Sequence, residues 1–281
     1  MNERTLSGSM LADYDCWLRR AERACATREK YLRSIRAFAA WLGSAAVTKD
    51  AVTEWKAHLV QQRQAPSTIN TALAALNGLF RFLGWEDCRA NFLKVQRRIF
   101  RDSERELTRT EYDRLLAAAE KIGDARLMLL MESICATGIR VSEVQYLTVE
   151  AAQCGRAEVA LKGKIRTILL PSKLCRKRLQ YAKTQKIARG EIFLTTGGKR
   201  MDRRQIWSAM KRLCRRAGVA PSKVFPHNLR HLFATAYYRV YHDIVKLADM
   251  LGHSSIETTR IYLLESGAEH RRQLDRLRLV T

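Results

Sequence analysis

Four side chains that could together cleave a phosphodiester lie within residues 225–262, near the C-terminal end of the chain. They are His227, Arg230, His253 and Tyr262. A guanidinium binds an anion, an imidazole transfers protons, and a phenol can act as a nucleophile. Chemistry of this kind requires neither a metal nor another cofactor. Any one of these residue types alone is more often structural, so the hypothesis depends on their joint spacing.

The local sequence predicts how these residues are positioned. Pro226 fits the first turn of a helix, which would place His227 and Arg230 on one helix face. The apolar positions that predict burial of this helix are Leu229, Phe233, Ala236 and Tyr237.

A second amphipathic run, residues 244–251, ends at Gly252, which is typical of a helix C-terminus. His253 is then expected on an exposed turn. Ser255 is a candidate cap for a third helix, with Tyr262 near its end.

The words HNLRHLFAT, LADMLGHSSIETT and RIY stand in this order in residues 227–262. The pattern H-x-x-R-H, then L-G-H, then a tyrosine nine residues later resembles the second signature box of the tyrosine recombinases, the phage integrase and Xer-type family. That family also carries an upstream arginine within T-G-hydrophobic-R-x-S-E. Residues 137–144 read TGIRVSEV and supply Arg140 in this context.

The resemblance implies a mechanism in which Tyr262 attacks the scissile phosphorus and forms a 3′-phosphotyrosyl bond. Arg140 and Arg230 would bind the two non-bridging oxygens, and His227 would accept the phenol proton. His253 would donate a hydrogen bond to the phosphate, and His231 would support this group. Glu143 is an accessory residue that could orient Arg140. The covalent link stores the energy of the broken bond, so neither ATP nor a divalent metal is expected.

Residues 157–170 predict a β-hairpin in which Val and Ile alternate with polar residues and Gly163 makes the turn. The family places its catalytic lysine in such a turn, at the lysine preceding a glycine. Lys162 is therefore the candidate general acid, with Lys164 as the alternative. A basic turn that only binds phosphate remains a third interpretation.

The composition is strongly basic. The 281 residues include 51 Lys and Arg against 28 Asp and Glu, a formal charge of +23, and 47% of the residues are hydrophobic. A folded protein of this charge is expected to bind a polyanion, with DNA or RNA as first choice. Seven scattered Cys and the lack of a signal peptide or long apolar run favour a cytoplasmic, nucleoid-associated protein of a bacterium, without a membrane partner.

Helical periodicity near 9–23, 27–42, 49–62 and 67–83 predicts an all-helical domain over residues 1–98. By resemblance this is the SAM-like core-binding domain, which clamps DNA. Three basic residues off its buried stripe are candidate DNA contacts: Arg28, Lys30 and Arg33. Charge-dense residues 99–106 are the expected linker, and 107–281 the catalytic domain.

A basic helix is expected within residues 197–216, opened by a capping-box spacing of Asp202 and Gln205. Ile206, Trp207 and Met210 are expected to face inward. This helix is a candidate for insertion into the major groove, or else a solvated charged face. Its candidate DNA contacts are Lys199, Arg200, Arg203, Arg204, Lys211 and Arg212.

The tail 264–281 carries an apolar stripe of Leu274, Leu277 and Val280. In the family such a tail often docks on a neighbouring protomer, although folding back in cis remains open. The resemblance implies a homo-tetramer on double-stranded DNA with inverted-repeat core sites, and a monomer or dimer when free.

Together these features predict a mainly α-helical fold with a small β-sheet, formed by a SAM-like helical domain and an α+β catalytic domain. The function predicted by resemblance is site-specific DNA recombination or integration. Two alternatives are a type IB topoisomerase-like relaxing enzyme and a catalytically silent DNA-binding factor of the same fold.

Overall fold

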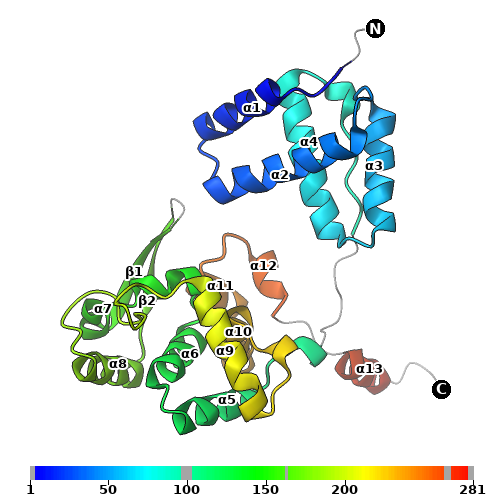
Figure 1. The fold of residues 1–281 in the computed structure, drawn as a ribbon. Coiled ribbons are helices and arrows are strands. Elements are labelled where there is room, and N and C mark those ends of the chain that lie inside the picture. Colours follow the sequence, from blue (N-terminus) through cyan, green and yellow to red (C-terminus); the bar gives the residue numbers. More distant parts are fainter. Residues whose placement is uncertain (1–3, 96–102, 162–163, 263–266, 278–281) are drawn as a thin grey trace. The chain divides into compact units, whose positions relative to one another are not determined.

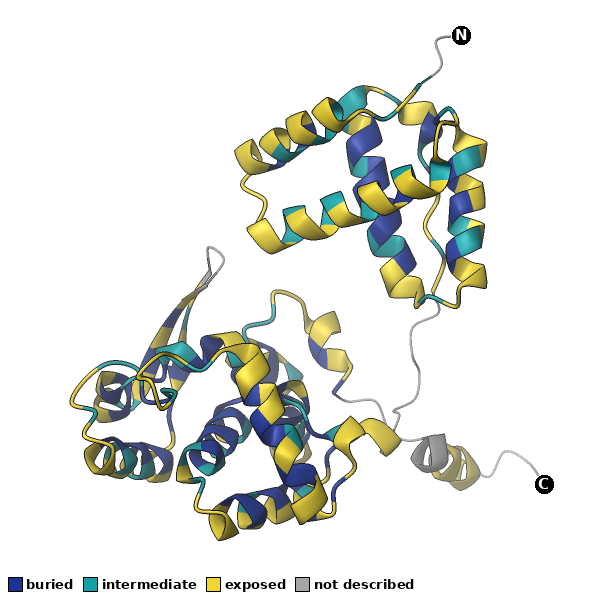
Figure 2. Ribbon diagram, viewed as in Figure 1, coloured by how far each residue is buried: buried dark blue, intermediate teal, exposed yellow. Residues whose placement is uncertain are grey.

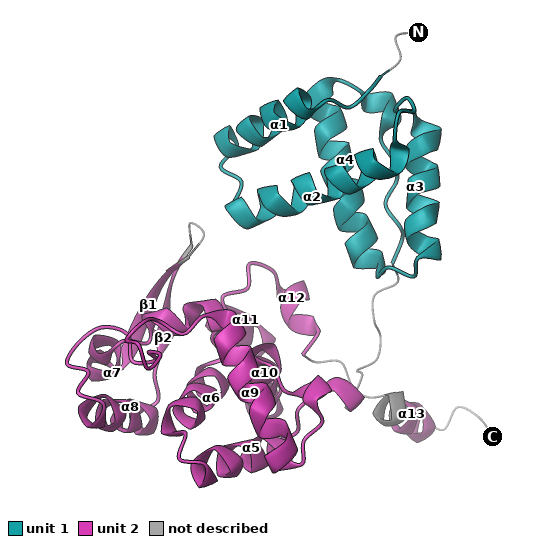
Figure 3. Cartoon of the chain, in the orientation of Figure 1, with its two compact units in different colours: residues 1–97 teal, residues 98–281 magenta. Residues whose placement is uncertain are grey.

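A computed structural model describes residues 4–95, 103–161, 164–262 and 267–277 of the chain. The chain divides into two compact units, residues 1–97 and 98–281 (Figure 3). Helices dominate both units in the described ranges, and the named strands there form a two-stranded sheet (Figure 1). The fold is therefore mainly α with a small β-sheet, as predicted.

The first unit contains four helices around one apolar core. They are α1 (Gly8–Arg20), α2 (Cys25–Leu42), α3 (Lys49–Gln61) and α4 (Pro66–Leu83), followed by a short 3-10 turn, Glu86–Cys88. Helix α4 supplies the centre of this core, because Leu73, Leu76 and Phe80 are all completely buried (Figure 2). Pro66 opens this helix and Gly84 ends it in the left-handed conformation, as helix-boundary chemistry predicts.

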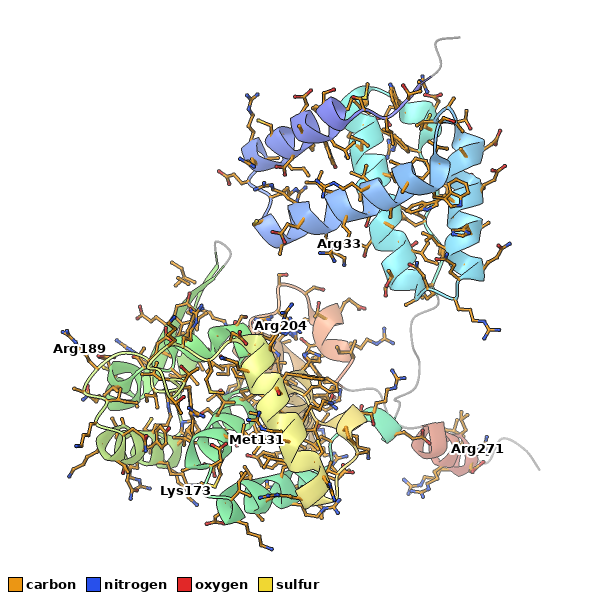
Figure 4. All side chains as sticks on the ribbon, in the orientation of Figure 1. Arg33, Met131, Lys173, Arg189, Arg204 and Arg271 are labelled. Carbon is orange, nitrogen blue, oxygen red and sulfur yellow. The ribbon has the colours of Figure 1, made fainter. Side chains whose placement is uncertain are left out.

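Helix α6 lies at the centre of the second unit, and its Leu130, Met131 and Ile134 are fully buried (Figure 4 labels Met131). Its helices are α5 (Arg109–Lys121), α6 (Ala125–Thr137), α7 (Val149–Cys154), α8 (Ser172–Thr184), α9 (Arg203–Ala217), α10 (Pro226–Tyr241), α11 (Ile244–Leu251), α12 (Ile256–Arg260) and α13 (Gly267–Arg276). Short 3-10 turns cover Ser103–Arg105, Val141–Tyr146 and Pro221–Lys223. Helices α5, α8, α9 and α10 all contact α6, which fixes the site described below to one rigid core.

The two strands, β1 (Arg156–Leu161) and β2 (Lys164–Leu169), pair antiparallel. Their alternation differs from the expected one. Ile168 is 4% exposed and faces the core, whereas Ile165 and Leu169 are 81% and 76% exposed. Arg166 lies on the inner side with only 15% of its side chain exposed. The hairpin is confirmed, but Ile165, Arg166 and Leu169 depart from an apolar-in, polar-out pattern, whereas Ile168 follows it.

Two further expectations need correction. Trp207 on α9 is 50% exposed, so it does not face inward, although Ile206 and Met210 are buried as expected. Ala236 on α10 is exposed, because the buried face of this helix runs through Leu229 and Ala234 instead. Both errors come from treating every apolar residue near a helix stripe as buried.

Within the second unit, the segment that precedes α5 is attached to α10. Asn228 Nδ2 donates hydrogen bonds to the backbone oxygens of Arg105, at 2.6 Å, and Lys223, at 2.8 Å. Residues 103–106, at the end of the segment expected to be a linker, are thus attached to α10. Among the described residues, no helix is both long and apolar enough to span a bilayer.

Candidate active site

Two glycines in the left-handed backbone conformation end helices α6 and α11, which border the site. Gly138 ends α6 with φ of 64° and Gly252 ends α11 with φ of 65°. The Gly138 carbonyl accepts a hydrogen bond from Arg230 Nη1 at 2.6 Å, and the Gly252 carbonyl accepts one from Arg140 Nη2 at 3.3 Å. A Cβ at position 138 would lie 2.4 Å from Phe233 Cδ1. Both glycines therefore serve the backbone turn and close packing, Gly138 against Phe233 and Gly252 against Arg166, while their carbonyls hold Arg230 and Arg140.

Arg230 is 2% exposed, on the buried face of α10. Its Nη2 donates to the Leu251 carbonyl at 2.8 Å and lies 2.8 Å from His253 Nε2. Burial is the main cause that lowers its pKa, followed by the charge of Arg140, while a hydrogen bond with Tyr262 opposes these effects. Fixed contacts to two helix ends hold its fork in one orientation, which suits it to bind an anion.

Arg140 is the cap residue of the 3-10 turn Val141–Tyr146, and Glu143 is its partner. The Glu143 carboxylate accepts the Arg140 backbone N–H at 2.7 Å and Arg140 Nη1 at 3.1 Å. Glu143 is 2% exposed, whereas the Arg140 side chain is 40% exposed. The buried carboxylate thus anchors a guanidinium that remains open to solvent on its other side.

Arg166 is a member of the site that the sequence analysis does not identify. Its Nη2 donates to Glu143 at 2.5 Å, and its Nη1 donates to the Met250 carbonyl at 2.8 Å. Strand β2 supplies it, four residues beyond the candidate general acid Lys162. A signal was available in the word KIRTILL, because an arginine there occupies an inward position of the hairpin register, opposite Val159.

His253 is half-buried and hydrogen-bonded, in contrast to the exposed turn expected from the sequence. Its Nδ1 lies 2.9 Å from Thr259 Oγ1, on the opposite side of the ring from Arg230. Burial first, and then the charges of Arg230, Arg140 and Arg166, lower the pKa of His253 to about 4. The ring is neutral at pH 7, and since the guanidinium can only donate, Nε2 accepts from Arg230 and Nδ1 carries the proton.

Tyr262 is 3% exposed and lies between two imidazoles. Its ring stacks on His253 with centroids 6.0 Å apart and meets the His231 ring edge-on at 4.9 Å. Glu106 Oε1 lies 3.6 Å from His231 Nε2, so the pre-α5 segment reaches this cluster. The rings of His231 and His253 thus hold the candidate nucleophile, Tyr262, beside Arg230.

His227 lies in the first turn of α10 and lines a cavity of about 820 Å³ together with Arg140 and Arg230. Close packing, and then the charges of Arg230, Arg140 and Arg203, lower its pKa. A neutral imidazole can accept a proton, which is the role expected of His227. The far wall of this cavity includes Trp207 and the N-terminal part of α9.

Two candidate residues of the hairpin turn cannot be placed. Lys162 lies outside the described residues, and for Lys164 only the strand backbone is described. The structure brings together the other predicted members of the site. They are Arg140, Glu143, His227, Arg230, His231, His253 and Tyr262.

The candidate DNA contacts differ in how free they are. Arg28 pairs with Asp15 at 2.7 Å and 2.9 Å, whereas Lys30 and Arg33 are exposed on α2. Lys211 donates to the Pro221 carbonyl and lies over the Trp207 ring at 5.1 Å. The remaining candidates are exposed: Lys199, Arg200, Arg203 and Arg204 around the start of α9, and Arg212 in its second half (Figure 4 labels Arg33 and Arg204).

The chemistry available here is that of organic cations, imidazoles and a phenol. Within the described ranges, no three His, Cys, Asp or Glu side chains lie together in a way that could hold a metal ion. The buried carboxylate of the site, Glu143, is paired with two arginines.

Comparisons with known proteins agree with this geometry. Residues 105–268 match the phage integrase family, and residues 11–87 match the N-terminal SAM-like domain of phage integrases. Tyrosine recombinase XerC of Roseiflexus castenholzii is 31% identical over 93% of this chain and 84% of its own length. Tyrosine recombinase XerA of Thermococcus kodakarensis is 26% identical over 96% of each chain.

Solved structures show the same fold. A lambda integrase dimer bound to a COC′ core site has a TM-score of 0.73 at 18% identity, over 93% of this chain and 77% of that one. XerH bound to difH substrate has a TM-score of 0.68 at 18% identity, over 97% of this chain and 90% of that one.

Neither alternative function, topoisomerase-like relaxation or silent DNA binding, is favoured by these similarities. The matched catalytic region covers more than half of the chain and contains all the site residues described above. The chain therefore belongs to the phage integrase family and is a tyrosine-type site-specific DNA recombinase.

Proposed function

We propose that Tyr262 is the nucleophile of strand cleavage and that Arg140 and Arg230 bind the scissile phosphate. The observation that supports this most directly is the position of the Tyr262 ring, packed between His231 and His253, whose Nε2 lies 2.8 Å from Arg230 Nη2. A phosphate bound by Arg230 would therefore lie next to the phenol oxygen. Positioning of this kind is worth several orders of magnitude in rate.

In the proposed reaction, the Tyr262 oxygen forms a bond to phosphorus while the bond to the 5′-oxygen of the next nucleotide breaks. His227 accepts the phenol proton, and Lys162 or Lys164 gives a proton to the departing 5′-oxygen. Arg140 and Arg230 face the charge that grows on the non-bridging oxygens in the transition state. Reversal of the same steps by a 5′-hydroxyl from another strand joins new partners without ATP.

The protonation state in which His253 acts is set by its surroundings. The neutral ring accepts from Arg230 in the free protein. When Arg230 turns a nitrogen to the phosphate, a bound anion favours the protonated imidazole, which can then donate to that phosphate. His231 supports the phenol ring from its other side.

The DNA partner is double-stranded, with inverted-repeat core sites, and both units contact it. Basic side chains around the start of α9 flank the cavity that holds Arg140 and His227, and Lys30 and Arg33 are free on α2. These contacts are expected to neutralise phosphates and to make binding fall steeply with salt. Lambda integrase and XerH have both been solved bound to DNA. Arg28 contributes less than its neighbours, because Asp15 already holds it.

The recombining assembly is a homo-tetramer on DNA, the state in which lambda integrase has been solved on a Holliday junction. Leu274 and Leu277 near the end of α13 are 54% and 58% exposed, and a short amphipathic helix of this kind is marginal alone in water. Docking of residues 264–281 on a neighbouring protomer would bury that stripe.

The test is covalent trapping on a nicked suicide substrate, from which the cut fragment diffuses away. The expected result is a protein–DNA adduct that forms in EDTA and is lost in Tyr262→Phe, while half-site binding is retained. Tyr241→Phe, which changes an exposed tyrosine on the same unit, is the matched control and should form the adduct normally. An adduct that persists in Tyr262→Phe, or a strict need for Mg²⁺, would contradict the proposal.

A further inference from the structure

The buried carboxylate of Glu143 is shared by two arginines. Its Oε1 accepts Arg140 Nη1 at 3.1 Å, and its Oε2 accepts Arg166 Nη2 at 2.5 Å and the Arg140 backbone N–H at 2.7 Å. Only 3% of the Glu143 side chain is exposed. Every charge-bearing oxygen of this group therefore has a partner, and the stronger side-chain pair is the one with Arg166.

Arg166 is held by three separate elements. Strand β2 carries it, the 3-10 turn Val141–Tyr146 supplies Glu143, and the last turn of α11 supplies the Met250 carbonyl at 2.8 Å. Its side chain crosses Gly252 so closely that a Cβ there would lie 2.6 Å from Arg166 Cδ. The Arg166 Nε atom is buried without a hydrogen-bond partner. Such a placement is costly and indicates a role beyond packing of the hairpin.

Without Arg166, Glu143 would be free to engage Arg140 differently. A lone carboxylate and a guanidinium prefer a two-pronged pair, which uses two N–H groups of the arginine. In the observed arrangement, Arg140 gives only Nη1 to Glu143 and turns Nη2 to Gly252. The 40% exposed guanidinium lines a hollow of about 490 Å³ together with His253 and Arg166. Arg166 thus limits how many N–H groups of Arg140 can be bonded to the Glu143 carboxylate.

We propose that Arg166 is a positioning residue for strand cleavage, which occupies one oxygen of Glu143 and so keeps the Arg140 fork oriented and available for the scissile phosphate. The inference rests on the proposed phosphate-binding role of Arg140. The simpler alternative is that Arg166 only fastens the hairpin to the helices. In that case its loss would change stability without a specific effect at the phosphate.

The experiment measures the first-order rate of covalent adduct formation at saturating suicide substrate. Arg166→Gln is expected to lower this rate by roughly 10- to 100-fold, as a small misplacement of a phosphate ligand does. Half-site affinity should change by less than about fivefold, since Arg140 and the other phosphate contacts remain. Arg166→Lys keeps the charge on Glu143 but loses the fork, and an intermediate rate is expected.

Two readouts separate positioning from simple support. In a Glu143→Gln background, Arg166→Gln should lower the rate of adduct formation by less than about a further threefold. The reason is that the effects of residues that act through one another are not additive. On a methylphosphonate substrate, which lacks one negatively charged oxygen, the penalty of Arg166→Gln should shrink to less than about threefold, because less cationic stabilisation is needed there. The matched control is Arg109→Gln, which removes an exposed, Asp113-paired arginine from the same unit and should leave every rate unchanged.

The proposal is overturned if folded Arg166→Gln cleaves at the wild-type rate, or if its penalty is equal on the phosphodiester and the methylphosphonate. If Arg166→Gln fails to fold, Arg166→Lys decides on the same two substrates. Failure of the underlying function looks different. Full cleavage by Arg140→Gln would remove the phosphate role of Arg140 itself, whatever the Arg166 variants do.

Discussion

The site has a helical side and a hairpin side, and they are built on different principles. On the helical side, Gly138 and Gly252 end two helices, and the chain turns there to present Arg140 and His253. On the hairpin side, β2 buries Arg166 and exposes Ile165. The helix ends obey the usual rules of capping, whereas at Ile165 and Arg166 the hairpin reverses the usual rule of burial. A local reversal of this kind is expected where function constrains the sequence.

The largest effect is expected on the helical side, at Arg230. Arg230→Gln should lower the cleavage rate about 10²- to 10³-fold, as loss of a phosphate-binding donor does. It should also destabilise the fold by roughly 2–4 kcal/mol, since the buried carbonyls of Gly138 and Leu251 lose their donor. Adduct formation and denaturant unfolding measure the two effects.

Arg178 offers a matched control for Arg230. Its side chain is also fully buried, on α8, but within the described residues its one hydrogen bond is a long one of 3.4 Å to the Thr148 carbonyl. Arg178→Met should therefore leave cleavage unchanged and cost little stability, because apolar side chains often replace poorly paired buried charges without loss. Equal loss of cleavage in both variants would show that burial, not the site, explains the effect at Arg230.

The next effect concerns the glycine turn of the helical side. Gly138→Ala should destabilise the fold by roughly 2–4 kcal/mol, because the new methyl group meets Phe233 and Leu251 and the backbone is left-handed. Cleavage should fall as well, since the Gly138 carbonyl holds Arg230. Gly155→Ala is the control: its φ is 68°, but nothing lies within 4 Å, so only the backbone strain of about 1 kcal/mol is expected. If Gly138→Ala and Gly155→Ala lost similar stability in thermal unfolding, close packing would be excluded as the reason why position 138 requires a glycine.

A smaller effect is expected from His253 below neutral pH. Its pKa is about 4 in the folded chain against 6.5 for a free imidazole, so the unfolded chain binds more protons between these values. The free energy of unfolding should therefore fall as the pH falls from about 6.5 towards 4. After a discount for partial exposure, the loss at pH 5 is about 1 kcal/mol.

The pKa of His227 is lowered as well, so the contribution of His253 to the pH dependence must be isolated with a variant. His253→Gln should remove part of the slope between pH 7 and pH 5, as measured by urea unfolding at each pH. An unchanged slope in this variant would mean that His253 is not held neutral by its surroundings.

The two sides also differ in how far the sequence predicted them. The helix ends at Gly138 and Gly252, and the grouping around Arg230, follow from local rules and from motif words with fixed spacing. The buried Arg166 does not, because its partners Glu143 and Met250 are distant in sequence and only tertiary contacts bring them together. The prediction that Trp207 faces inward was wrong for a related reason.

Trp207 lies beside an apolar stripe on α9, yet the structure leaves it 50% exposed, at the wall of the large cavity. Periodicity identifies a helix face but cannot say where a neighbouring element stops covering it. The same limit applies to Glu106: nothing in the charge-dense segment before α5 indicates that one carboxylate reaches His231. Contacts of this kind depend on the assembled core.

The smallest effect is expected from Ile165→Ala, and its comparison with Ile168→Ala is the most direct test of the reversed burial in the hairpin. Ile165 and Ile168 lie on the same strand, but the first is 81% exposed and the second 4% exposed. Ile168→Ala should destabilise the fold by roughly 2–4 kcal/mol, as truncation of a buried side chain does. Ile165→Ala should cost less than about 1 kcal/mol, because little is lost beyond strand propensity. Denaturant unfolding of the two variants compares them directly, and equal losses would mean that Ile165 is covered in solution and that Arg166 need not occupy the inner face.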